Sequence, residues 1–266
     1  TTGTNHVAVG QGAMQNNTTG AAPQCAFGYY ALFTNTDGYY NTAIGAQALY
    51  SNSTANKNTA VGNLALYSNE TGEENCAFGH YALKENTRAK NSGFGNFSLL
   101  NASGANNSAL GFEAGDLTTT GTNNTSLGYQ SDPSANDADN EVTLGNSSVS
   151  AIRCQVQTIS SLSDRRDKKS IKELPVGLDF INDLKPVKFV WDMRDGAKKG
   201  IQEIGFVAQD LDESQINADA EDYLNLVLKN NPDKLEASYG KLVPILVKAV
   251  QELSAEVNHL KEKLNT

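Results

Sequence analysis

The sequence predicts a mainly β repeat shaft, a trimeric β-helix or β-solenoid, followed by a small α/β domain that ends in a long helix of a trimeric coiled coil. Three observations predict this fold class: a motif repeated nine times, an abrupt change of composition near residue 160, and a heptad pattern at the end of the chain. The expected units are a shaft over 1–139, a β-stem over 140–162 and a C-terminal domain over 163–266, with 241–266 helical.

Each repeat is a short apolar stretch that ends in glycine. The copies read HVAVG, QCAFG, NTAIG, NTAVG, NCAFG, NSGFG, NSALG, NTSLG and EVTLG. Their glycines are Gly10, Gly28, Gly45, Gly62, Gly79, Gly95, Gly111, Gly128 and Gly145. The intervals of 16 to 18 residues, with a second apolar pair after most glycines, predict two short strands and two turns in each unit.

Stacking gives these units a core that no single unit has, because equivalent apolar residues then form continuous columns. Cys25 and Cys76 both precede Ala-Phe-Gly, so we predict that they occupy equivalent inward positions. The glycines suit positive φ or close backbone approach, and the asparagines suit left-handed turns or stacked amide ladders. A disordered Asn/Thr/Gly linker is the alternative, and the fixed apolar phase argues against it. The repeats resemble those of trimeric adhesin heads and viral fibre shafts.

The composition argues against several classes of protein. A net charge of -9 argues against a surface that binds nucleic acid. The sequence contains no run of about 18 apolar residues, so insertion into a membrane is not expected. The three cysteines, Cys25, Cys76 and Cys154, lack metal-ligand spacing, so we interpret them as small buried apolar residues. No metal and no cofactor are expected. A chain that opens on Thr1 is expected to be a fragment of a longer protein.

Glycan hydrolysis is not expected either, because the repeats contain no dense carboxylate cluster. Several acids crowd one loop, which we interpret as a solvated insertion: Asp132, Asp137, Asp139 and Glu141.

The second half of the chain has the composition of a mixed α/β domain. Leu178, Ile181 and Leu184 lie at helical spacing before Pro186, which predicts a helix that ends there. The segments VKFVWD, EIGFVAQ and YLNLVLK predict strands over 187–192, 203–209 and 223–229.

The last residues carry a heptad seam. Its positions are Leu246, Val250, Leu253, Val257, Leu260 and Leu264. A helix that begins at Leu242 tolerates Pro244 in its first turn. An amphipathic helix packed on its own domain explains the pattern as well as a coiled coil does, but a heptad that holds through the last residues favours association between chains.

A charged segment separates the two halves. Five of the eight residues from Arg165 to Lys172 are Lys or Arg, whereas residues 1–157 contain only five in total. Taken alone, Ser163 and Asp164 ahead of this segment are typical of a helix N-cap.

Four motifs, SLSDRRDKKSI, GLDFINDLKPVKFVW, EIGFVAQDL and YGKLVPILVKAVQEL, occur in this order over 161–266. Together they resemble the C-terminal intramolecular chaperone of endosialidases and of phage tail fibre, spike and appendage proteins. The resemblance implies a homotrimer that assists folding of the β-helical shaft and then releases itself by autoproteolysis between Leu162 and Ser163. The family's serine and lysine map onto Ser163 and Lys168, and Asp164 is a supporting candidate. Asp167 stands where many relatives carry Leu.

A Ser-Lys dyad needs a neutral lysine to accept the hydroxyl proton, and an ordinary lysine with a pKa near 10.4 is neutral in only about one molecule in 2,500 at pH 7. Burial on assembly must therefore supply most of the required change. The hydroxyl could attack the carbonyl of Leu162 by an N-to-O acyl shift, or act as an ordinary nucleophile in cis or across the trimer.

We therefore expect a virion tail fibre or appendage fragment with a single-turnover serine endopeptidase, whose chaperone domain is released in the host cytoplasm. A host surface receptor or glycan could bind the shaft. The alternatives are a trimeric cell-surface adhesin fragment and a non-cleaving structural trimerisation domain.

Overall fold

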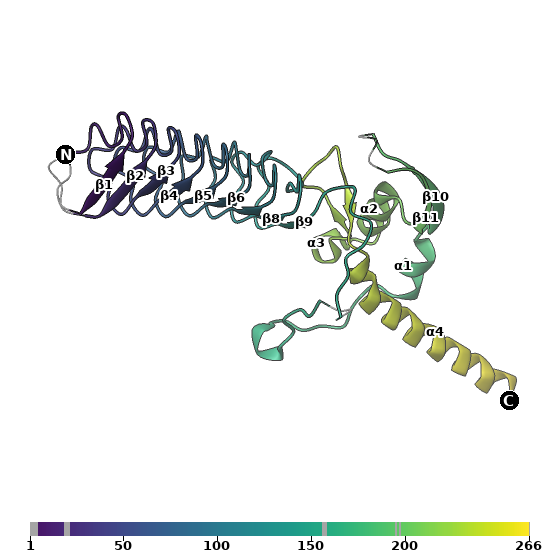
Figure 1. The fold of residues 1–266 in the computed structure, drawn as a ribbon. Coiled ribbons are helices and arrows are strands. Elements are labelled where there is room, and N and C mark those ends of the chain that lie inside the picture. The colour runs from purple at the N-terminus through teal and green to yellow at the C-terminus, as the bar shows by residue number, and fades with distance from the viewer. Residues whose placement is uncertain (1–4, 19–21, 156–158, 195, 197, 266) are drawn as a thin grey trace. The chain divides into compact units, whose positions relative to one another are not determined.

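The chain forms two compact units, Thr1–Val149 and Ser150–Thr266. The computed structural model describes residues 5–18, 22–155, 159–194, 196 and 198–265. The first unit is a stack of short strands, and the second mixes helices with two small hairpins (Figure 1). The predicted order of β-solenoid, small α/β region and long C-terminal helix is confirmed.

The solenoid contains one strand per repeat, where two were predicted, in a single nine-stranded parallel sheet whose strands follow the order of the sequence. The second apolar pair, where a repeat has one, lies in a turn. Equivalent residues pair directly, as Ala26 does with Ala43 and Ala43 with Ala60. This register explains why the repeat keeps its phase, since a slip of one residue would turn every side chain to the other face. The strands are β1 His6–Val9, β2 Gln24–Phe27, β3 Thr42–Ile44, β4 Thr59–Val61, β5 Cys76–Phe78, β6 Ser92–Phe94, β7 Ser108–Leu110, β8 Thr125–Leu127 and β9 Val142–Leu144.

Small residues fill the inward position of these strands, and one larger side chain from each of the first six coils completes the core. Ala26, Ala43, Ala60 and Ala77 are fully buried at the centres of their strands. The larger residues form a second buried column: Met14, Leu32, Leu49, Leu66, Leu83 and Leu99. A second row of buried alanines, which includes Ala31, Ala48 and Ala65, packs in the same core.

The leucine column lies on strained backbone. Its members have φ values between 49° and 53°, in the left-handed region that non-glycine residues rarely adopt. The conformation costs roughly 1 to 2 kcal/mol per residue, while complete burial of a leucine contributes roughly 1.5 to 3 kcal/mol. Burial offsets the strain only when neighbouring coils cover each leucine. The strained conformation is therefore stable only in a coil that is stacked on its neighbours.

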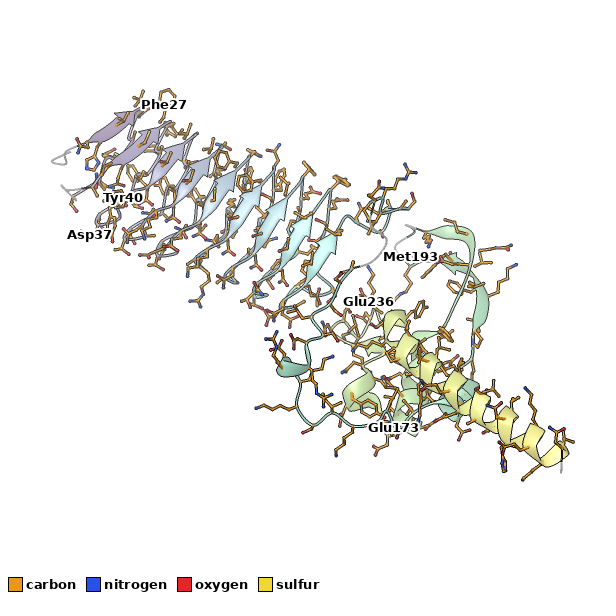
Figure 2. All side chains as sticks on the ribbon, turned by 90° about the horizontal axis from the view of Figure 1, so that it is seen from below. Phe27, Asp37, Tyr40, Glu173, Met193 and Glu236 are labelled. Carbon is orange, nitrogen blue, oxygen red and sulfur yellow. The ribbon has the colours of Figure 1, made fainter. Side chains whose placement is uncertain are left out.

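The residue before each repeat glycine points outward, and we call this row the outer stripe. Its members are Val9, Phe27, Ile44, Val61, Phe78, Phe94, Leu110, Leu127 and Leu144. All except Val61 are exposed, from 38% at Phe94 to 58% at Leu110. Figure 2 shows Phe27 on the outside of the solenoid. The stripe therefore leaves a continuous apolar row on the single chain.

The prediction for the cysteines is partly wrong. Cys25 and Cys76 do occupy equivalent positions, but both are half-buried, and Cys154 is exposed. The inward position that follows each of the first two belongs to Ala26 or Ala77. Because strand side chains alternate between faces, the alanine takes the narrow interior.

Asparagine ladders support the turns, as predicted. Asn58 donates its backbone N–H to Asn41 Oδ1 and accepts from the N–H of Asn75 in the same way, each at 2.9 Å. The amide of Asn58 also donates to the carbonyl oxygen of Gly72 at 2.9 Å. Each buried amide thus satisfies backbone groups of adjoining coils that the short strands leave unpaired.

The repeat glycine is required by both conformation and space. Gly45 has a φ of +135°, and a Cβ at this position would lie 2.4 Å from the carbonyl oxygen of Gly62. Any other residue would force neighbouring coils apart at this corner.

In the last coils, Gly115 and then Asp132 take the place of the leucine, and Asp116 follows Gly115 in the chain. Gly115 follows Leu99 in the column, and its N–H donates to the carbonyl of Ser131, so Asp132 takes the next equivalent place. The predicted solvated loop is therefore wrong for this residue, which is partly buried. Burial, then repulsion from Asp132 and Glu113, raises the pKa of Asp116 to about 6.

We expect Asp116→Asn to remove part of the pH dependence of shaft stability. The pKa of Asp116 is about 6 in the folded shaft and 3.8 ordinarily. The contribution of this group to folding stability is therefore complete below pH 3.8 and is lost as pH rises through 6. After allowance for solvent screening, the variant should be more stable than wild type by about 1 kcal/mol at pH 8. Thermal unfolding from pH 4 to 8 measures the difference, and parallel curves for both proteins would contradict it.

Beyond β9 the described residues up to 162 form no strand, and 156–158 lie outside the described residues. The predicted β-stem over 140–162 therefore contains β9, and its extent as a unit stays a prediction.

Among its described residues, the second unit contains two three-residue turns of 3-10 helix, η1 and η2, four α-helices and two small hairpins. Strand β10 pairs antiparallel with β11, and β12 pairs antiparallel with β13. Its core consists of Val176, Phe180, Ala220, Leu224, Leu226, Leu242 and Ile245. The elements are η1 Arg165–Asp167, α1 Leu178–Asp183, β10 Val187–Asp192, β11 Lys199–Gly205, α2 Ala208–Asn217, α3 Glu221–Leu224, β12 Val227–Leu228, β13 Glu236–Ala237, η2 Tyr239–Lys241 and α4 Leu242–Leu264.

The predicted helix before Pro186, the strand VKFVWD and the C-terminal helix are confirmed. The strand predicted over 203–209 is wrong in its second half, because β11 ends at Gly205 and α2 begins at Ala208. Of 223–229, only Val227–Leu228 is a strand, since α3 ends at Leu224 and Asn225 has left-handed backbone.

Candidate functional site

Ser163 and Lys168 meet in the second unit although five positions separate them. Lys168 Nζ donates a hydrogen bond of 2.6 Å to Ser163 Oγ. After loss of a proton, the same nitrogen could accept one from the hydroxyl, which is the geometry that a Ser-Lys dyad requires. The structure therefore brings together the two residues predicted as nucleophile and base.

The turn η1 brings them together, and Asp164 stabilises it. Asp164 Oδ1 accepts from the N–H of Arg166 at 2.8 Å, so Asp164, rather than Ser163, is the N-cap. The N–H of Lys168 closes the turn on the carbonyl of Arg165 at 3.2 Å. The serine hydroxyl is therefore not used as a cap.

The guanidinium of Arg166 also donates to the carboxylate of Asp164. Sequence reasoning did not predict this contact. Its Nη2 lies 2.6 Å from Asp164 Oδ2, and its Nε lies 3.1 Å from each oxygen. The hydrogen bonds from the side chain and then the backbone of Arg166 lower the pKa of Asp164. The carboxylate of Asp164 thus stabilises the turn through its bonds to Arg166. The sequence signal for such a contact is an acid two residues before an arginine.

The segment around Ser163 and Lys168 is exposed in the single chain. Every described residue from 159 to 173 is exposed, including Leu162, Ser163 and Lys168. Water therefore surrounds the side chains of Ser163 and Lys168 in the single chain.

The six seam residues are all exposed on α4, from 40% at Val257 to 84% at Leu264. The helix packs on its own unit through a different row, Leu242, Ile245 and Ala249, which are buried. The sequence left packing on the same domain and association between chains open. The structure shows that the seam does not serve the first purpose.

Glu252 and Lys248 join α4 to the start of α1. Glu252 Oε2 accepts from the N–H of Leu178 at 2.7 Å, while Lys248 contacts both Glu173 and Glu252. Sequence reasoning missed both residues, because their partners Leu178 and Glu173 are more than 70 positions away.

Comparison with known families decides what this segment resembles. Residues 163–220 match the family described as chaperone of endosialidase. The match begins at Ser163 and confirms the predicted resemblance for this part of the chain, whereas the motif YGKLVPILVKAVQEL lies beyond it. The chaperone-of-endosialidase family is associated with self-cleaving chaperone activity, and such a segment after a β-solenoid fits a phage tail fibre fragment. Neither the curated proteins nor the solved structures contain a match to the chain.

In the described parts of the chain, no three His, Cys, Asp or Glu side chains gather as they would around a metal ion. Among the same residues, no helix has both the length and the apolar composition needed to cross a bilayer.

Proposed function

We propose that three copies of this chain assemble into a fragment of a phage tail fibre or appendage, and that the chaperone domain cuts itself free between Leu162 and Ser163. The observation that carries the proposal is the 2.6 Å contact between Lys168 Nζ and Ser163 Oγ, at the first residue of the family match. The virion is the proposed location of the shaft.

Two apolar surfaces support association of copies. The seam of α4 and the outer stripe of the solenoid are each exposed in the single chain and follow regular spacings. Long exposed apolar rows mark interaction surfaces, because burying one such side chain contributes roughly 1.5 to 3 kcal/mol. A closed trimer would cover both rows with equivalent rows of other copies.

The proposed reaction starts from a neutral Lys168. Its Nζ takes the hydroxyl proton as Ser163 Oγ attacks the carbonyl carbon of Leu162 in its own or another copy. The bond from this carbon to the nitrogen of Ser163 breaks, the nitrogen gains a proton, and an ester remains. Water then hydrolyses the ester to a carboxylate at Leu162 and restores the hydroxyl.

Coupling to assembly gives the cleavage its purpose. Each shaft strand pairs with its neighbour in the same chain, but the outer stripes of three copies must meet from separate chains. A trimerising domain that holds the chain ends together raises the effective concentration of these stripes and so favours their association. Because the dyad is solvated in the single chain, burial on assembly would delay cleavage until the chains have joined. Afterwards a high unfolding barrier would keep the shaft trimeric.

Two arms of one experiment test the proposal. Intact mass under denaturing conditions should reveal pieces 1–162 and 163–266 after purification of the full chain. Residues 1–162 expressed alone should aggregate or stay unfolded. An uncut trimeric chain would contradict the protease, and a soluble β-rich trimer from 1–162 alone would contradict an essential chaperone.

A further inference from the structure

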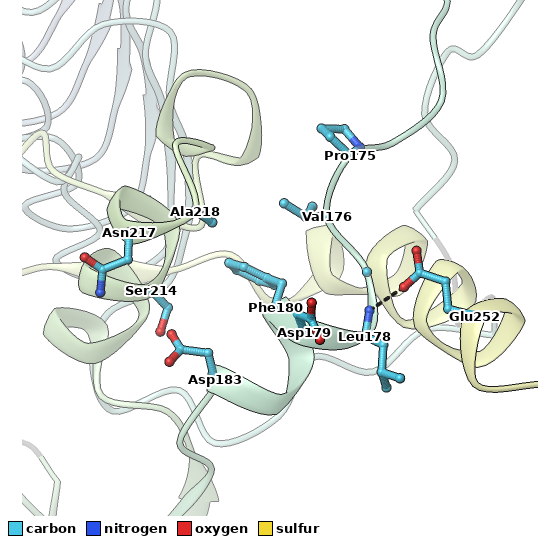
Figure 3. A pocket seen from close by; sticks show the side chains of 11 residues that line it. Pro175, Val176, Leu178, Asp179, Phe180, Asp183, Ser214, Asn217, Ala218 and Glu252 are labelled. Carbon is cyan, nitrogen blue, oxygen red and sulfur yellow. Dashed lines mark hydrogen bonds between the residues drawn. The ribbon is translucent and has the colours of Figure 1, made fainter. Parts of the chain in front are cut away.

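A pocket of about 390 Å³ lies in the second unit between α1, α2 and α4 (Figure 3). Apolar groups of Val176, Phe180 and Ala218 line it together with three carboxylates. These acids are Asp179 and Asp183 from α1 and Glu252 from α4. The pocket thus combines an apolar surface with an acidic rim.

Two of these carboxylates lack a cation. Glu252 is engaged by Lys248 and by the N–H of Leu178, but the salt bridges and hydrogen bonds of the described residues include neither Asp179 nor Asp183. Lys and Arg bury an aliphatic stem while the charged end stays polar. An apolar wall beside two free carboxylates therefore fits a long basic side chain.

The chain itself contains a basic segment that is free to fill such a site. We call Arg165–Lys172 the basic segment, and all its residues are exposed. Arg165, Lys169 and Lys172 take part in no salt bridge between described residues. Charge complementarity thus pairs this segment with the acidic pocket.

We propose that Lys169 of a second copy occupies the pocket. Lys168 has extended backbone, with φ −118° and ψ 136°. Because successive side chains of extended backbone point to opposite sides, Lys169 can enter the pocket while Lys168 stays on Ser163.

A second copy is the donor because the pocket adjoins the proposed seam. Glu252 lines the pocket, and the next residue, Leu253, belongs to the seam where copies would meet. The inference therefore rests on the proposed trimer and deepens it. Docking would fix the basic segment and remove water beside Ser163 and Lys168, so that assembly prepares the dyad.

Disulfide trapping tests the contact without relying on cleavage. Two differently tagged chains, both carrying Ser163→Ala and with Cys25, Cys76 and Cys154 replaced, would be co-expressed. One carries Lys169→Cys and the other Asp183→Cys, so any bond between the two tags joins two copies. Under mild oxidation, a mixed-tag dimer should appear on a non-reducing denaturing gel. Asp222→Cys on α3, exposed and outside the pocket, is the matched control.

Light scattering separates the outcomes. The proposed contact is supported if the protein is a trimer and Asp183→Cys gives the mixed-tag dimer in much larger amount than Asp222→Cys does. A trimer without the mixed band, or with equal bands for both positions, overturns it and leaves the proposed function standing. A monomer overturns both.

Charge reversal provides a second readout in the cleaving chain. Asp183→Lys should slow cleavage roughly tenfold, the factor that corresponds to about 1.4 kcal/mol, and Lys169→Asp in the same chain should restore the rate. Unchanged cleavage in the single variant, or no recovery in the double variant, argues against the contact.

Discussion

Ser163→Ala is expected to leave the full-length chain uncut and still trimeric. The hydroxyl supplies the nucleophile, and without it the peptide bond after Leu162 should survive, with cleavage reduced by several orders of magnitude. The substitution removes no cap, because Asp164 caps the turn. It also leaves the apolar seam and the solenoid core unchanged. Intact mass and light scattering on the same sample measure both properties.

Ser161→Ala is the matched control, since it removes an exposed hydroxyl two positions earlier and should cleave at the wild-type rate. N-terminal sequencing of any product locates the cut. If the Ser163→Ala protein still releases a chain that begins at residue 163, the dyad assignment fails.

Lys168→Arg extends this test to the base. Arginine keeps a charge and a donor at the same place but stays protonated, so it should block cleavage as well. Dissociated wild-type chains should also remain uncut. Cleavage of the Lys168→Arg protein at the wild-type rate would point to a different base.

The repeat period was sufficient to predict the solenoid, but not which side chains face inward. Each strand alternates between a small residue and a larger apolar one, as in Ala26 followed by Phe27, so both faces looked apolar in sequence. The interior between closely wound coils admits alanine, and the larger side chain is left outside. The width of the coil decides which side chain faces inward, and this width cannot be deduced from a repeat period of 17 residues.

The candidate site shows a similar division. Serine and lysine five positions apart could be identified from the motif, but their contact depends on the turn that Asp164 and Arg166 hold. On α4, the buried row that includes Leu242 and Ile245 runs beside the heptad seam, so the sequence pattern supported packing on either face. Only the position of α1 and its partners shows which row the unit uses.

The second large effect is expected at this seam. Replacing Leu253 and Leu260 together by Asp should abolish the trimer, because a closed seam would bury two carboxylates from every copy. Each buried, unpaired charge costs several kcal/mol even after relaxation, and the apolar contacts are lost as well. In the single chain both leucines are exposed, so the variant should keep the fold of the second unit. Light scattering at micromolar concentration should give a monomer near 28.4 kDa.

Ala255→Asp with Asn258→Asp is the matched control, because it adds the same charge to exposed positions of α4 outside the seam. Its cost should be limited to helix propensity, below about 1 kcal/mol per residue, and the trimer should persist. If Leu253→Asp with Leu260→Asp also stays trimeric, the seam is not the assembly surface. If only the seam variant is monomeric, it should also remain uncut, since a dyad that depends on burial between copies cannot form in a single chain.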